Sequence, residues 1–204
     1  MLLSETVEGL YHTPLYAFDG TQWVLLNERG YLAAYDRFIS DRAFGQKKRI
    51  LTTPGNAPLP YIDTYYRAGT PNSDSTFIVE SQNPDMDEHG THLHVYMLRE
   101  VLFRLQVFAW QEVGKNAAGQ TLREFVELPG QHWCDLERYG VVNSSELLIA
   151  SSSYTLTTSR LVDLPPDCKL VVDLGYRKLS FRITERFDLM NSVQLRLGEW
   201  DGDA

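Results

Sequence analysis

The chain contains little cysteine, no long apolar run and no excess of basic residues. Its two cysteines, Cys134 and Cys168, lie far apart in the 204-residue sequence and outside any Cys-x-x-Cys spacing. Metal binding by them is poorly supported, and free thiols in a reducing compartment are expected. No stretch approaches the ~18 apolar residues of a membrane span, and the first residues lack the segments of a secretory signal. We expect a soluble chain made in a cytoplasm, with no membrane partner.

Basic residues are too few for a surface that reads nucleic acid. The sequence has 19 Lys and Arg against 27 Asp and Glu, a net charge of −8. Proteins that read nucleic acid normally carry a basic face. The one compact basic cluster, Lys47-Lys48-Arg49, is typical of a solvated loop.

Motifs of catalysis and cofactor binding are also missing. The sequence has neither a P-loop nor a dinucleotide-binding glycine pattern. No Gly-x-Ser-x-Gly elbow surrounds the serine-rich stretches at 144–145 and 151–153. Carboxylates such as Asp63 and Glu80 belong to separate predicted elements, and no feature selects a pair for glycoside hydrolysis. We therefore expect no cofactor and no enzymatic turnover.

The residues that are present favour a sheet-rich fold. Apolar residues make up 43% and aromatic residues 12% of the chain, which is enough for a packed core. Short β-branched and aromatic runs bounded by Gly, Pro, Asn or Asp predict strands throughout. Apolar residues at helical spacing predict one helix at 28–46. The expected fold class is mainly β, with one or two small β-barrels or sandwiches in tandem and one short helix.

The segment from Leu93 to Val113 alternates apolar and polar residues, as strands with one buried face do. Its phase breaks at 98–100, which predicts two strands or one bulged strand, with a helix as the alternative. Residues 114–120 are interpreted as a linker or a long hairpin loop. The predicted domains are a β-barrel-like domain at 1–113, which contains the helix, and a second β-barrel at 121–204.

The two halves share a pattern that suggests an internal repeat. Ile50–Gly69 and Thr155–Gly175 each contain Leu-Thr-Thr, then Leu-Pro, then an apolar strand that ends in Gly. The next strands, Phe-Ile-Val-Glu-Ser from Phe77 and Phe-Arg-Ile-Thr-Glu from Phe181, match in type. Such a repeat suits two small barrels in tandem. The alternative is a chance match, because the shared motifs are short.

The stretch Asp-Met-Asp-Glu-His-Gly-Thr-His-Leu-His, residues 85–94, holds three of the five histidines. His92 and His94 would lie on one face of a strand, and with His89 they are weak candidates for a zinc-type site. The spacing is not a helical pattern that carries a general base. Turn-forming residues nearby favour a hairpin, with both strand histidines on the outward face and the intervening apolar residues facing inward.

Motifs in the C-terminal part follow one order along the chain. They are Tyr154-Thr155-Leu156, a turn at Leu164-Pro165-Pro166, a strand at Lys169–Leu174, Gly175, Phe181-Arg182-Ile183-Thr184 and Leu195-Arg196-Leu197. In this order they resemble the small barrels of head–tail joining and head-closure (stopper) proteins of tailed bacteriophages. Residues 76–98 resemble phage neck proteins with a Val-x-Ser-x-Asn-x-Asp turn. Members of that family are usually nearer half this length, and the first 45 residues match no family.

The resemblance implies a structural virion protein of the neck, assembled in the host cytoplasm. It implies a ring of six or twelve copies around the DNA channel, with portal or adaptor and tail terminator or tail tube proteins as partners. Double-stranded DNA would pass without sequence-specific binding, and an acidic chain fits because adhesion would slow ejection. The exact station in the virion stays open. We expect partner contacts on turns at Asn56, Asn72, Asp74, Asn83, Asp85, Asp87 and His89.

Two functions of other classes stay open. One is a metal-dependent enzyme or metal-stabilised domain that uses His89, His92 and His94. The other is a tail-tip or baseplate receptor-binding β module. Exposed Trp23, Trp110 and Trp133 would then line a shallow groove, although we expect these residues mostly in cores.

Overall fold

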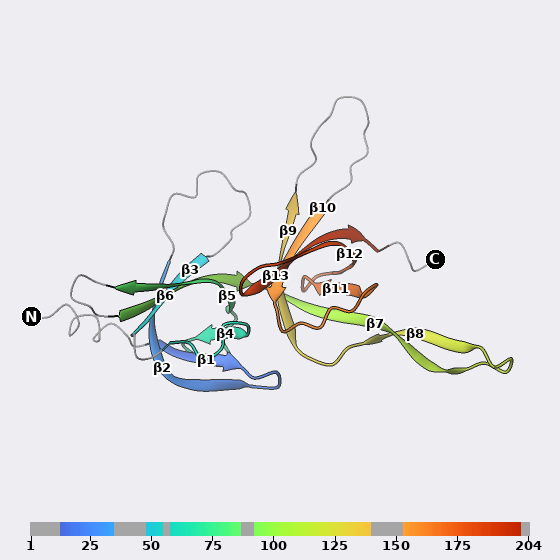
Figure 1. Cartoon of the computed structure of the whole chain (residues 1–204), viewed down its shortest axis with the longest axis horizontal. Coiled ribbons are helices and arrows are strands. Elements are labelled where there is room, and N and C mark those ends of the chain that lie inside the picture. The colour runs from blue at the N-terminus through green and yellow to red at the C-terminus, as the bar shows by residue number, and fades with distance from the viewer. Residues whose placement is uncertain (1–12, 35–47, 55–57, 87–91, 140–152, 201–204) are drawn as a thin grey trace, which may run out of the picture. The chain divides into compact units, whose positions relative to one another are not determined.

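The computed structural model describes residues 13–34, 48–54, 58–86, 92–139 and 153–200, and these form strands and turns (Figure 1). The mainly-β fold class is confirmed. The part of the chain so described contains no helix long and apolar enough to cross a membrane. The chain divides into two compact units, and each is considered by itself. Unit 1 is Met1–Leu102 with Ser159–Leu161 and Leu189–Ser192; unit 2 is Phe103–Thr158, Val162–Asp188 and Val193–Ala204.

Unit 1 contains a closed antiparallel barrel with strand order β1-β2-β3-β6-β5-β4. Strand β1 pairs with β2 on one side and with β4 on the other, which closes the circuit. Inward side chains such as Leu15, Leu51, Tyr66 and Leu98 form its core, because alternate residues of a barrel strand face inward. The strands are β1 (Thr13–Phe18), β2 (Trp23–Ala34), β3 (Lys48–Pro54), β4 (Tyr65–Ala68), β5 (Thr76–Met86) and β6 (His92–Val101).

A tight turn joins β1 to β2. Asp19 Oδ1 accepts hydrogen bonds from the backbone N–H groups of Thr21 (2.9 Å) and Gln22 (2.8 Å). These bonds favour the ionised carboxylate and lower the pKa of Asp19. Gly20 has a φ of 101°, a conformation that costs glycine little. The side chain of Asp19 therefore ends β1 and reverses the chain without a long loop.

Unit 2 contains a seven-stranded sheet with order β11-β12-β13-β10-β9-β7-β8 and an additional pairing of β11 with β7. Since β7 pairs with both β9 and β11, six of the strands form a closed circuit, and β8 lies outside it. The strands are β7 (Phe103–Lys115), β8 (Thr121–Glu127), β9 (His132–Tyr139), β10 (Ser153–Ser159), β11 (Lys169–Asp173), β12 (Lys178–Asp188) and β13 (Ser192–Glu199).

The two circuits have the same strand order. The strands of unit 1, taken along the chain from β1 to β6, correspond one by one to β7, β9, β10, β11, β12 and β13 of unit 2. With this correspondence the strand order around the first circuit becomes the order around the second, read in the opposite direction. The Leu-Thr-Thr motifs occupy equivalent strands with equivalent partners: Leu51 lies opposite Leu32, and Leu156 lies opposite Leu136. Both motif leucines are fully buried. The topology and this register therefore support the internal repeat.

The strands β5 and β12 give the closest match. Phe77 lies opposite Glu100 in the first circuit, and Phe181 lies opposite Glu199 in the second. Each strand then has a β-bulge at the fourth residue of its motif, between Val79 and Ser81 and between Ile183 and Glu185. A bulge adds an unpaired residue at one defined point of a ladder, so the two circuits agree in the position of this irregularity as well as in strand order.

Two expectations from the sequence are corrected. The predicted helix at 28–46 is wrong over residues 28–34, which belong to β2, and residues 35–47 lie outside the described part. Pairing of β2 with β1 and β3 outweighs the helical spacing of a few apolar residues. The units divide between Leu102 and Phe103 and not at 114–120. The alternative interpretation of 114–120 as a hairpin loop is confirmed, because the segment joins the paired strands β7 and β8.

The prediction of two strands between Leu93 and Val113 is confirmed, although the break falls at exposed Leu102 and not at 98–100. The hairpin at the histidine-rich stretch is confirmed too, since β5 and β6 pair up to Met86 and His92. The predicted inward face of β6 was wrong. Tyr96 and Leu98 point into the core, so His94 shares the inward-facing set, near the end of the barrel.

Candidate functional site

Strands β7 and β8 continue beyond the other strands of unit 2 as a two-stranded ribbon (Figure 1). The pairing of β7 with β11 ends at Phe108 opposite Lys169, whereas β7 itself runs on to Lys115. The equivalent strands of unit 1 are joined by the tight turn at Asp19. The ribbon is therefore an addition that closing the barrel does not require.

The loop of the ribbon is ordered by one asparagine. Asn116 Oδ1 accepts hydrogen bonds from the backbone N–H groups of Ala118 (3.0 Å) and Gln120 (2.9 Å). Its Nδ2 donates to Gln120 Oε1 at 2.8 Å, and Gly119 takes a φ of 78°. This Asx-type geometry makes Gly-Lys-Asn-Ala-Ala-Gly a reverse turn and not a linker.

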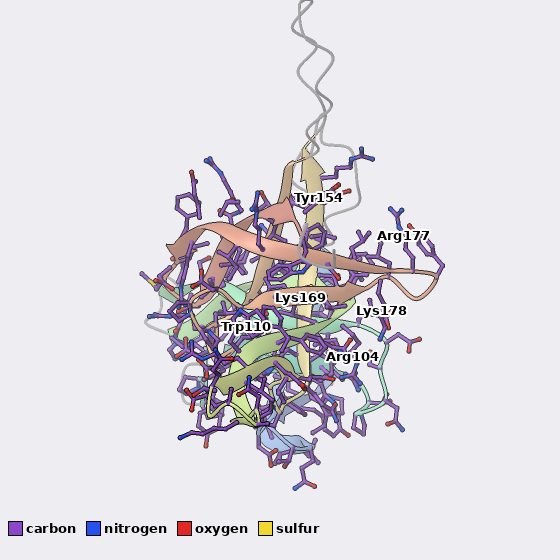
Figure 2. The ribbon with its side chains drawn as sticks, turned by 90° about the vertical axis from the view of Figure 1, so that its right-hand side faces the viewer. Arg104, Trp110, Tyr154, Lys169, Arg177 and Lys178 are labelled. Atoms are coloured by element: carbon purple, nitrogen blue, oxygen red, sulfur yellow. The ribbon has the colours of Figure 1, made fainter. Side chains whose placement is uncertain are left out.

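Aromatic rings hold the base of the ribbon. The ring centroids of Trp110 and Phe125, which face each other across β7 and β8, are 4.0 Å apart. Phe125 also meets Trp200 edge to face, at 5.1 Å, and Lys169 Nζ lies 5.6 Å from the Trp200 ring centroid. Figure 2 labels Trp110 and Lys169 on this part of unit 2. A cavity of about 210 Å³, lined in part by Trp110, Cys168 and Trp200, lies beside β7 where β11 departs from it.

The ribbon exposes apolar side chains in water. Trp110 is 52% exposed, and Val113 and Leu122 are 47% and 45% exposed. An ion pair on the ribbon joins two exposed side chains, Glu112 and Arg123, at 3.4 Å, and such surface pairs stabilise little. Isolated two-stranded ribbons are only marginally stable in water. A partner that covers these apolar side chains would therefore stabilise the ribbon.

Unit 2 also contains a polar groove of about 360 Å³. Several side chains that line the groove are hydrogen-bonded to one another. Gln106 Nε2 donates to Glu127 Oε1 (2.9 Å), and Lys178 Nζ donates to Gln106 Oε1 (3.3 Å). Arg104 bonds Gln131 at 3.2 Å and stacks on the buried Trp133. Figure 2 labels Arg104 and Lys178 on this side.

The ionisable groups of the groove do not form a recognisable catalytic set. Burial lowers the pKa of His132, which keeps its imidazole neutral near pH 7. Lys178 and Arg104 balance Glu127 and Asp173, which also line the groove. With opposite charges balanced and the amides of Gln106 and Gln131 bonded to charged side chains, the groove offers neither an activated nucleophile nor a focused field for an anion.

The metal candidates are only partly placed. His89 lies outside the described residues. His92 is the first residue of β6, and only its backbone position is described. His94 Nδ1 lies 3.3 Å from Gln82 Nε2, and its ring stacks on Tyr96. Among the residues that the structure describes, no group of three or more His, Cys, Asp or Glu side chains is placed to hold a metal ion.

The structure describes only some of the residues that were expected to contact partners. Asn72 and Asp74 are exposed in the turn between β4 and β5, and Asn83 is exposed on β5. The backbone of Asp85 pairs with Leu93. Residues 56, 87 and 89 (Asn56, Asp87 and His89) lie outside the described part of the chain.

The tryptophans and cysteines complete the placement of the predicted residues. Trp133 is buried as expected, Trp23 is partly buried beneath Arg67, and Trp110 is exposed. Cys134 and Cys168 are both buried and not joined in a disulfide. Burial raises the pKa of both thiols, that of Cys168 to about 11.

Comparisons with protein-family models, curated proteins and solved structures found no match to this chain. The candidate site therefore rests on the ribbon itself. Sequence reasoning missed it because 114–120 was interpreted as a possible domain boundary. The available signal was a pair of segments with aromatic and β-branched residues, 107–113 and 121–127, on both sides of an Asn- and Gly-containing turn.

Proposed function

We propose that the chain is a non-catalytic structural subunit that works by assembly, and that its place is the neck of a tailed bacteriophage. The observation that carries the assembly role is the β7–β8 ribbon, which exposes Trp110, Val113 and Leu122 beyond a closed circuit of strands. Exposed apolar clusters of this kind mark interaction surfaces. The phage assignment rests on the order of motifs from Tyr154 to Leu197.

Closed barrels suit a subunit that has to associate in one defined way. In a closed circuit every strand has two neighbours, which limits the edge that the barrel body offers to unspecific pairing. The ribbon lies outside the closed circuit, and its strands pair with each other alone beyond Phe108 and Lys169. Specificity is gained when one element associates and the remaining strands cannot.

The charge of the chain supports a position around a DNA channel. A net charge of −8 repels DNA phosphates, and salt screens this repulsion beyond about 10 Å. A ring wall of this character lets double-stranded DNA pass without adhesion. The proposed partners are further copies of the chain, the portal or an adaptor protein, and tail terminator or tail tube proteins.

Cross-linking mass spectrometry on intact virions that carry this chain tests the proposal. We expect cross-links from unit 1 or unit 2 to portal and tail proteins, and antibody labelling at the head–tail junction. Labelling at the tail tip would favour the receptor-binding module instead. Virions that lack the chain, or cross-links to neither portal nor tail proteins, would refute the neck assignment.

A further inference from the structure

We propose that ribbons of neighbouring copies pair edge to edge, β8 of one copy with the outer half of β7 of the next, in a repeating head-to-tail contact. This inference deepens the proposed function and rests on it in one respect, namely that the chain self-associates. It assigns the contact to named positions. Arg123 lies opposite Glu112 of the neighbouring copy, and Phe125 lies opposite Trp110 of the neighbouring copy.

The direction of the free backbone groups follows from the register of the ribbon. Leu128 N donates to Val107 O at 2.7 Å, next to the facing pair Phe108 and Glu127. In an antiparallel ladder, hydrogen-bonded and non-hydrogen-bonded pairs alternate. The pair Ala109 and Val126 is therefore hydrogen-bonded.

The same alternation settles the next pairs along the ribbon. Trp110 with Phe125 is a non-hydrogen-bonded pair, and so is Glu112 with Arg123. The N–H and C=O groups of these four residues consequently point away from their partner strand. Arg123 and Phe125 present theirs at the outer edge of β8, and Trp110 and Glu112 present theirs at the outer edge of β7.

These two edges are complementary in a head-to-tail arrangement. Antiparallel pairing of the β8 edge with the β7 edge of a neighbour joins outward groups to outward groups at both positions. The side chains of all four residues lie on one face of the ribbon, so facing pairs keep the same side, as sheet pairing requires. Arginine then faces glutamate and phenylalanine faces tryptophan, which are stabilising cross-strand pairs.

Symmetric pairing of like edges is less favourable. A two-fold contact between two β8 strands that centres on Arg123 or Glu124 places like charges opposite each other. A two-fold contact between two β7 strands that centres on Glu112 sets carboxylate against carboxylate. Like charges directly opposite destabilise a sheet. The charge pattern thus favours the head-to-tail contact, which repeats from copy to copy and closes a ring or continues as a filament.

The composition of the ribbon supports a second copy as the partner. Between Ala109 and Glu127 there are two cations and three carboxylates, so the ribbon carries little of the chain's net charge of −8. Ribbons can therefore approach each other without the repulsion that acts between the acidic bodies of the chain. A copy of the same ribbon also offers the complementary aromatic and charged positions at the correct spacing.

A proline substitution at the free edge tests the contact. In R123P the outward N–H of β8 is lost, while the inward bonds between β7 and β8 stay possible because residue 123 does not pair inward. R123A keeps the N–H and removes the same side chain, so it is the matched control. Sedimentation and native mass spectrometry of full-length protein should show at least a roughly tenfold weaker self-association for R123P, and within about threefold of wild type for R123A.

Hydrogen exchange at Glu124 distinguishes loss of the contact from loss of the ribbon, because its N–H points inward to Gln111. Protection there should be retained in R123P. Equal association of R123P and wild type would overturn the proposal. Wild-type protein that stays monomeric at about 100 μM would also overturn it, because even weak self-association is detectable at that concentration. If R123P protein still enters virion necks normally, the contact fails and the proposed function stands.

Disulfide trapping tests the register and the symmetry. Mixed single variants E112C and R123C should form 112–123 cross-links between chains, since facing residues of a hydrogen-bonded pair have Cα atoms about 5.5 Å apart. Separate chains are needed because positions 112 and 123 also face each other within one chain. The native cysteines do not compete, being buried. Dominant 112–112 or 123–123 products, or no product, would refute head-to-tail pairing.

Discussion

The rings of Trp110 and Phe125 pack against each other at facing positions of β7 and β8, with centroids 4.0 Å apart and planes tilted by 35°. The pair lies at the base of the ribbon, where the strands leave the closed circuit. Its non-hydrogen-bonded position brings the side chains closer than the alternate pairs. The ribbon therefore depends on this contact more than on its exposed ion pair.

Replacing Trp110 by alanine should loosen the ribbon and leave the barrel folded. The lost aromatic contact is worth about 0.5–1.5 kcal/mol. Hydrogen exchange should show faster exchange across Thr121–Glu127, with the buried strand β11 unaffected. Y176A is the control, since Tyr176 is 79% exposed at the turn between β11 and β12. Unchanged protection of β8 in W110A would contradict the role of the Trp110–Phe125 pair.

Alanine at Gly30 should destabilise unit 1. A Cβ there would overlap Leu51 Cδ1 and lie 3.3 Å from Leu15 Cδ1, and crowding of a packed core typically costs about 1–3 kcal/mol. Thermal or chemical unfolding of full-length protein measures the loss. The double variant G30A/L51V should recover part of it because the shorter side chain makes room. Additive losses in the double variant would show that the two residues do not conflict.

The thiol of Cys168 should make the protein less stable at alkaline pH. An unfolded thiol ionises from about pH 8.5, whereas burial raises the pKa of Cys168 to about 11. Between these values the unfolded state binds fewer protons, so stability falls as pH rises, by at most about 1.4 kcal/mol per pH unit. Denaturant unfolding at pH 8 to 10.5 should give a steeper decline for wild type than for C168A. Parallel curves would contradict a protonated native thiol.

His132 should make the protein less stable under mildly acidic conditions. Burial lowers its pKa below the usual value of about 6.5. As pH falls below that value, the unfolded imidazole binds a proton that the native one resists, so stability falls. Unfolding measured from pH 7.5 to 5 should show a shallower loss for H132Q than for wild type. An equal loss in both proteins would mean that His132 protonates as readily in the native state.

Much of the fold is predictable from local pattern. Strand segments such as Thr76–Ser81 are recognisable because they contain short apolar runs or alternate apolar and polar residues. Turn-forming residues on either side mark where each strand ends. The Leu-Thr-Thr and Phe-containing motifs pointed to a repeat because equivalent barrel positions require similar residues. The helix predicted at 28–46 was wrong over residues 28–34, because Tyr31 and its neighbours fit a helical face and a strand of a barrel equally well.

The candidate site was harder to predict. Exposed Trp110 has the same residue type and spacing as a buried strand residue, and only the end of the β7–β11 pairing leaves it in water. The phase of β6 was also assigned to the wrong face. Whether Tyr96 or Met97 faces inward depends on the register of β6 with β3, and a shift of one residue exchanges the two faces of β6.

The sequence by itself determined the strand-rich class, the turns at Asp19 and Asn116, and the repeated motifs. These depend on interactions between near neighbours, which composition and spacing encode directly. The closure of each circuit, the matched bulges at residues 80 and 184, and the free edges of the ribbon were decided only by tertiary structure. They depend on which distant strands pair and in which register, and that choice minimises exposed apolar surface over the whole unit.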